Sequence, residues 1–367
     1  MRKLRKATSF GCGGLLILCL ALAVISTISN RGLPTRPQPT DRLDPLDKAR
    51  LEESIHLKSQ LGESVWPGWG KMEIPIILWN QDYSFLITYP DQPPGWEVIP
   101  DDTFFGQFYY RQPSDDPQNF AVNVDERWVA SIGTKYEMDA SLIGVFQELL
   151  PPVIEKIFPY RLLILPSEVQ ISAALHESFH VYQAEVVRQR LEAAESAHKL
   201  GDAYWQADES MHDAWAEEIE KLSNALAAPT DQEAAEWVRQ FLGQRLQRRS
   251  SQGLTQDLID YERWLEWEEG LAKYVELAIW KAAYEARAYQ PVDGLANDPD
   301  FKRYATFPQR WSQEVDQMKR QAKQDGETRF YYTGMAQAML LERLMVNWKA
   351  RILSENVWLE TLLGAIE

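Results

Sequence analysis

A helix that carries two histidines one turn apart is the feature of this sequence that most restricts its fold. Residues 176–180 read His-Glu-Ser-Phe-His, and the surrounding residues 169–185 contain neither Pro nor Gly. Residues at i and i+4 project from one face of a helix, so His176 and His180 can bind one tetrahedral zinc ion while Glu177 addresses a water there. An amphipathic helix with two histidines by coincidence is the alternative, but the chain has only five histidines.

A third protein ligand is required, because two histidines hold zinc weakly. No further histidine follows at the spacing of the HExxHxxGxxH pattern, and Gln183 stands where that pattern needs Gly. The best remaining candidates lie in the acidic run of residues 264–276, Trp-Leu-Glu-Trp-Glu-Glu-Gly-Leu-Ala-Lys-Tyr-Val-Glu.

This run resembles the gluzincins, in which a second helix supplies the third zinc ligand, and specifically the aminopeptidase-N-like branch with its Trp-Leu-Asn-Glu-Gly-x-Ala-x-Tyr type of sequence. The resemblance implies that Glu269 is the ligand and that Gly270 lets the two active-site helices approach closely. Glu268 is the nearest competitor. One more surface charge on an acidic helix is the alternative interpretation of Glu269.

The same branch has a catalytic tyrosine in a Tyr-x-x-Gly pattern further along the chain. Residues 331–334 read Tyr-Tyr-Thr-Gly, and Tyr331 follows Glu269 by 62 positions (331 minus 269). The resemblance implies that Tyr331 donates a hydrogen bond to the oxyanion that forms during hydrolysis, with Tyr332 in reserve. An aromatic pair that packs at a helix start is the alternative.

The chain also departs from this family. Glu269 follows His180 by 89 positions (269 minus 180), which makes residues at about 186–260 an insertion; otherwise Glu217 or Glu218 would be the third ligand. The Gly-x-Met-Glu-Asn sequence that recognises a free amino terminus is absent, so aminopeptidase activity is not supported. The Glu-x-x-x-Asp pattern of the thermolysin branch is absent too, because Lys273 follows Glu269 at the fourth position.

The N-terminus predicts attachment to a membrane. Residues 1–30 have four cations and no acid, and residues 10–28 are uncharged and mostly apolar, close to the roughly 20 residues that span a bilayer. The basic flank should stay in the cytoplasm, which predicts a single-pass protein with its C-terminal part outside. Cleavage near residues 21–23 would instead give a secreted protein. Both cysteines lie in this segment, so the exported part has no disulfide.

The remainder of the chain divides by composition. Residues 31–44 are a Pro-rich linker that should act as an extended spacer, residues 45–165 are strand-rich and residues 166–367 are mainly helical. A helix is expected at 45–60, followed by strands at 73–79, 84–88, 104–111 and 120–124. The inserted segment should form two or three long helices with charged, solvent-exposed faces. The fold class is therefore α+β, and the resemblance implies a zincin-like architecture.

These features predict a zinc peptidase that acts on peptide or protein substrates outside the cytoplasm. The net charge of −16 becomes −20 without the four N-terminal cations (−16 minus +4), which makes nucleic acid an unexpected partner. A membrane-tethered binding or scaffold protein that keeps the zincin fold without turnover is the main alternative, and an ester or epoxide substrate is a third. Substrate specificity, endo- or exopeptidase action and oligomeric state stay open.

Overall fold

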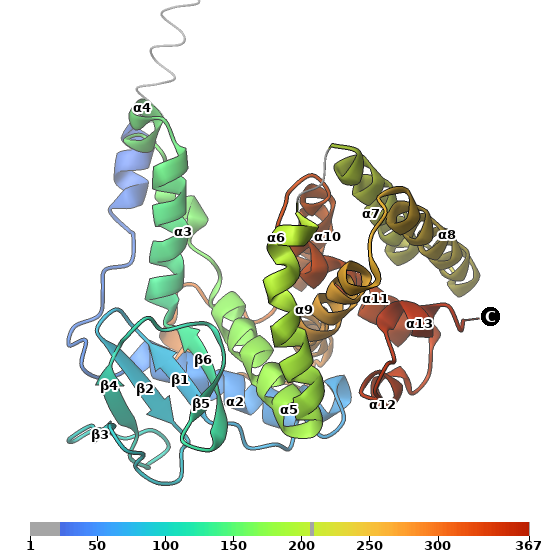
Figure 1. Cartoon of the computed structure of the whole chain (residues 1–367). Helices are drawn as coiled ribbons and strands as arrows, with labels where there is room; N and C mark the ends of the chain where they lie inside the picture. Colours follow the sequence, from blue (N-terminus) through green and yellow to red (C-terminus); the bar gives the residue numbers. More distant parts are fainter. Residues whose placement is uncertain (1–22, 206–208, 367) are drawn as a thin grey trace, which may run out of the picture.

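The computed structural model describes residues 23–205 and 209–366, with the strands in the N-terminal part and most of the helices after it (Figure 1). The strands are β1 (Ile76–Trp79), β2 (Tyr83–Ile87), β3 (Glu97–Val98), β4 (Tyr110–Pro113), β5 (Phe120–Val124) and β6 (Arg127–Gly133). The first helices are α2 (Pro45–Val65), α3 (Lys135–Leu149), α4 (Pro152–Glu155), η1 (Tyr160–Leu163), α5 (Ser167–Ala197), η2 (His198–Leu200) and α6 (Gly201–Tyr204). The later helices are α7 (Glu209–Ala227), α8 (Asp231–Ser251), α9 (Gln256–Glu285), η3 (Asp293–Asn297), α10 (Phe307–Gln321), α11 (Thr328–Leu344), α12 (Trp348–Ile352) and α13 (Leu359–Leu363). The predicted order, a strand-rich part followed by a helical part, is confirmed.

Most of the apolar segment predicted to enter a membrane lies outside this description. Residues 10–22 of that segment are not described, and residues 23–30 are helical. Among the described helices, none combines the length and the apolar character needed to cross a bilayer.

The six strands form one sheet in the order β3-β4-β2-β1-β6-β5. β1 and β6 run parallel, and the other neighbours run antiparallel. Successive side chains of a strand face opposite sides of a sheet, so Ile76 and Leu78 enter the main core while Ile77 enters a smaller cluster on the other face. β5 is the last strand, and its outer edge pairs with no strand of the described chain.

Three of the four predicted strands correspond to β1, β2 and β5. The strand predicted at 104–111 is wrong over most of its length, because Phe105 and Gly106 have positive φ angles of 52° and 73° and form a turn. β4 starts only at Tyr110. β6 was not predicted: five consecutive buried residues give it no alternation of polar and apolar side chains.

α2 begins at Pro45, as predicted, and extends to Val65. The Asp44 side chain accepts a hydrogen bond from the backbone N–H of Leu46 at 2.8 Å, which caps this helix. The preceding residues 31–44 form no helix or strand, in line with their prolines. They are not a free spacer, however, because Arg36 pairs with Asp82 at 2.9 Å and fixes the segment against the sheet.

Residues at about 186–260, predicted from the sequence to be an insertion, contain the helical hairpin of α7 and α8, at the opposite side of the molecule from the sheet (Figure 1). The expectation that its charges are solvent-exposed is wrong for the face that meets α9. Arg248 is fully buried and binds Glu218 of α7 at 2.7 Å and Glu262 of α9 at 2.6 Å. Arg245, also buried, binds Glu266 of α9 at 2.6 Å.

One carboxylate near the C-terminus completes this buried network. Glu360 of α13 binds Arg245 at 3.1 Å, Arg249 at 2.8 Å and Arg263 at 2.7 Å. The cations of α8 and α9 outweigh the effect of burial and lower the pKa of Glu360 to about 2. A buried charge is stable only when it is paired, so the hairpin, α9 and α13 depend on one another.

Candidate metal centre

α5 presents both motif histidines to α9. On one side of α5, the ring of Phe179 packs edge-on against Trp66 at 4.8 Å, and the Trp69 indole N–H donates a hydrogen bond to Ser178 Oγ at 3.2 Å. These contacts hold that side of the helix against the end of α2 and the loop after it. His176 and His180 therefore face the interior, where both are buried.

The structure brings Glu269 of α9 to the two imidazoles. Its Oε2 lies 3.2 Å from His176 Nε2 and 3.4 Å from His180 Nε2, and the two Nε2 atoms are 3.2 Å apart. A tetrahedral zinc ion with bonds of roughly 2.0–2.2 Å holds its ligand atoms about 3.3–3.6 Å apart. The three separations lie within about 0.1 Å of the spacing on one face of such a tetrahedron, and the group could hold a metal ion.

The other nitrogen of each imidazole faces a fixed polar group. His180 Nδ1 is 2.9 Å from Gln183 Oε1, and the amide N–H₂ of Gln183 donates to the carbonyls of Trp267 and Glu268 on α9. His176 Nδ1 lies 3.5 Å from Glu276 Oε2. The hydrogen bond to Gln183 orients the imidazole of His180 and leaves its Nε2 free to bind a metal, whereas Glu276 lies beside His176 Nδ1 without a hydrogen bond.

The site is electrostatically arranged for a cation. Burial disfavours a charged His176, but Glu269 and Glu276 outweigh it and raise the pKa of His176 to about 10. Burial also opposes the charge on Glu269, yet His180 and His176 hold its pKa below the usual range. Two carboxylates thus face the imidazoles in the protein interior, and a bound cation would take the place of the proton.

Glu177 and Tyr331 border the three ligand atoms. Burial raises the pKa of Glu177 to about 7, against the opposing effect of the two histidines. The Tyr331 ring stacks on that of His176, with centroids 6.0 Å apart and planes 11° apart. Burial, together with the Glu269 carboxylate, raises the pKa of Tyr331 well above its usual value, so the phenol keeps its proton.

Comparisons of the chain with protein-family models, with curated proteins and with solved structures give no match.

Two glycines set the position of Tyr331. Gly270 of α9 and Gly334 of α11 meet at a helix crossing, where a Cβ added to Gly270 would lie 2.5 Å from the Cα of Gly334. The expectation was that Gly270 lets the two active-site helices approach; the atoms nearest to it belong to the tyrosine-bearing helix α11, so the close approach that it permits is the one between α9 and α11. The Tyr-x-x-Gly spacing places Tyr331 one turn before this crossing and beside Glu269.

Replacement of Gly334 with Ala is expected to lower the free energy of unfolding by roughly 1–3 kcal/mol, the usual range for overpacking. The new Cβ would lie 2.4 Å from the carbonyl oxygen of Glu266, which is backbone and can yield only if α9 and α11 separate. Chemical denaturation measures the change. Gly243→Ala is the control, because that exposed helical glycine has open space around it and Ala should stabilise it by up to about 1 kcal/mol. Equal stability of the two variants would contradict the close crossing.

The other residues considered as third ligand or as catalytic tyrosine are not part of the group formed by His176, His180 and Glu269. Glu218 is paired with two buried arginines, and Glu217 accepts a hydrogen bond from Gln244 on the exposed side of the hairpin. Glu268 Oε2 lies 3.0 Å from His198, and Glu268 is not one of the three residues grouped around the motif histidines. His198, Glu268 and Glu269 are close enough to form a second potential ligand group. The electrostatic surroundings of Tyr332 are Glu314, Glu276 and Arg310, whereas those of Tyr331 include Glu269.

Sequence reasoning missed three side chains of the centre. Gln183 was noted only as a departure from a motif, although its spacing of three residues from His180 places it on the same helix face. Glu276 stands two helical turns after Glu269, which puts both carboxylates on one face of α9. His198 bridges Glu268 and Glu327 across α9 and α11, and no local pattern marks it because both partners are distant in sequence.

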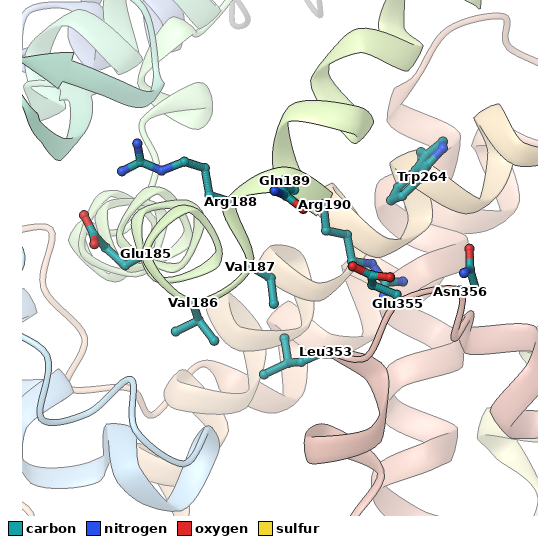
Figure 2. A pocket seen from close by; sticks show the side chains of 10 residues that line it. All are labelled: Glu185, Val186, Val187, Arg188, Gln189, Arg190, Trp264, Leu353, Glu355 and Asn356. Carbon is teal, nitrogen blue, oxygen red and sulfur yellow. The ribbon is translucent and has the colours of Figure 1, made fainter.

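A separate pocket of about 490 Å³ opens where α5 bends (Figure 2). The bend is at Val187, which has non-helical φ and ψ angles of −140° and 49°. Trp264 of α9 and the loop around Leu353 complete its wall, and none of the lining residues is one of the three potential metal ligands. The pocket is therefore distinct from the candidate metal centre.

Proposed function

We propose that this protein is a zinc-dependent peptidase of the gluzincin type, attached to a membrane and active outside the cytoplasm. The observation that carries the proposal is the tetrahedral spacing of the His176, His180 and Glu269 ligand atoms. If these three residues formed only a chance ion pair, there would be no reason for a carboxyl group and a phenol to lie beside them. Glu177 and Tyr331 supply both.

Each residue then has a defined task. Zinc held by His176, His180 and Glu269 would polarise a carbonyl and acidify a water. Glu177, whose pKa is raised to about 7, accepts the proton of that water and passes it to the departing amine. Tyr331 keeps its own proton and donates a hydrogen bond to the developing oxyanion.

The sheet favours a peptide as substrate. β5 is an edge strand, and the ring of Phe120 at its start lies 4.7 Å from the ring of His180. An extended peptide can add to a free strand edge through backbone hydrogen bonds, independent of its sequence. A peptide bound in this way would lie beside the metal centre. A small ester or epoxide has no peptide backbone that could pair with a strand edge.

Metal analysis tests the proposal. We expect about one zinc per chain in the purified protein, and hydrolysis of an unstructured protein that a chelator abolishes and added zinc restores. His180→Ala should lose both zinc and activity, because two ligands bind zinc weakly. His212→Ala is the matched control, since His212 lies on α7 and its partner among the described residues is the exposed Asp325.

The outcomes separate the alternatives. Zinc without hydrolysis would favour a binding or scaffold protein that keeps the metal for stability. Hydrolysis that survives both the chelator and the His180→Ala replacement would contradict the zinc mechanism altogether.

A further inference from the structure

Exposed apolar side chains gather at one end of the molecule, which we call the tip and define as residues 23–30, the last half of α3, and α4. Figure 1 shows these three segments side by side, far from the sheet. Seven of the fifteen large apolar side chains exposed in the described chain belong to the tip: Val24, Ile25, Ile28, Val145, Leu149, Val153 and Ile154. Leu149 and Val153 are 74% and 75% exposed. Exposed apolar patches of this kind mark surfaces that contact another protein or a membrane.

The helix of residues 23–30 is fastened to the tip by polar contacts. Ser26 Oγ and Asn30 Nδ2 both donate hydrogen bonds to the carbonyl of Phe158, each at 2.9 Å, and Ser26 is buried. The Phe158 ring in turn stacks on Phe146 of α3 at 5.9 Å. The start of the described chain is therefore held against the end of α3, with its apolar residues facing outward.

The sequence indicates what covers the tip. Residues 10–28 are uncharged and mostly apolar, so they are the part of the chain suited to a lipid bilayer, and residues 23–28 of this run belong to the tip. A bilayer that receives residues 10–22 must come next to residues 23–30, and hence next to Leu149 and Val153. The charged side chains of the tip in α3 and α4 are the exposed Glu148 and the half-buried Glu155, and the exposed Lys156 follows α4 directly. The tip thus has no excess of positive charge, so its attraction to lipid is apolar.

We propose that the tip is a second lipid-contact surface, in which the ends of α3 and α4 enter the interfacial layer of the membrane beside the N-terminal segment. A single flexible attachment would let the body tumble, whereas two adjoining contacts fix its orientation. α3 has 15 residues and is therefore about 22 Å long, and it joins the tip at one end to β6 at the other. The sheet and the metal centre are held away from the lipid at a set height.

Spin labels on the full-length protein test the lipid contact without any use of enzymatic turnover. Cys12 and Cys19 are replaced by Ser, and one cysteine is introduced in place of Leu149 or Val153. The spin-labelled protein is then reconstituted in phosphatidylcholine vesicles. Collisions with dissolved oxygen report lipid, and collisions with a water-soluble nickel chelate report water. Leu246→Cys is the control, because Leu246 is 68% exposed on α8 and lies away from the tip.

We expect the ratio of oxygen to nickel collisions to be several-fold higher at 149 and 153 than at 246. Equal ratios at all three positions in vesicle-bound protein would overturn the second contact while leaving the N-terminal attachment intact. Failure of the protein to bind vesicles would overturn both. Dipolar broadening at 149 that disappears on dilution with unlabelled protein would show that a second copy covers the tip, and would also overturn the proposal.

Discussion

Replacement of Glu177 with Gln is expected to leave zinc in place and to lower kcat/KM by at least about 10²–10⁴-fold, the range typical of a lost general base. The amide keeps the size of the side chain but cannot accept the proton of water. Glu177 itself lies outside the ligand group of His176, His180 and Glu269, so metal content should be unaffected. Zinc analysis and steady-state hydrolysis of an unstructured protein measure the two effects on the same sample.

Glu185→Gln provides the control on the same helix, because Glu185 is exposed and belongs to the separate pocket. It should hydrolyse at the parent rate. If Glu177→Gln also hydrolysed at the parent rate, the assigned mechanism would be wrong. If it lost zinc as well as activity, Glu177 would have a structural part in the centre.

Replacement of Arg248 with Met is expected to destabilise the protein by about 3–5 kcal/mol, the usual cost of breaking a buried ion pair. Arg248 lies 3.7 Å above the Trp215 ring, and its removal leaves Glu218 and Glu262 facing each other as buried carboxylates with one partner fewer. Total stabilities are about 5–15 kcal/mol, so the loss is a large fraction of the whole. The midpoint of urea unfolding measures it.

A surface arginine of the same helix provides the control that separates the effect of burial from the effect of losing an arginine. Arg239 pairs at 2.8 Å with Glu236, and both side chains are more than half exposed. Arg239→Met should change stability by no more than about 0.5 kcal/mol. A loss no larger than this for Arg248→Met would show that the buried network is not needed for folding.

The features predicted best from the sequence are those that depend on neighbouring residues of one helix. The placement of His176 and His180 on one face follows from their spacing alone, and their burial follows from the apolar residues around them. Glu269 could be chosen only through a family resemblance, because a separation of 89 positions hides its proximity to His180. The structure brings it to the imidazoles without Glu217 or Glu218.

The predictions that failed depended on contacts between segments distant in the sequence. The partner of Gly270 is a glycine of α11, and no local pattern says which of two neighbouring helices a small residue will meet. The buried face of the α7–α8 hairpin was mistaken for a solvated one, since Arg and Glu look alike in sequence whether they are paired inside or hydrated outside. β6 was missed because a strand buried on both faces lacks the alternation by which strands are recognised.

The contacts of Glu360 also have a consequence for the order of events during synthesis. Arg245 and Arg249 emerge from the ribosome more than a hundred residues before the carboxylate that pairs with both of them. Until residue 360 is available, Arg245 can pair with Glu218 and Glu266, and Arg249 with Glu262, but the buried network lacks the carboxylate that binds both arginines. Since α9 also carries Glu269, the network that packs against the helix of the candidate metal centre is completed late in synthesis, after nearly the whole of the described chain has been made.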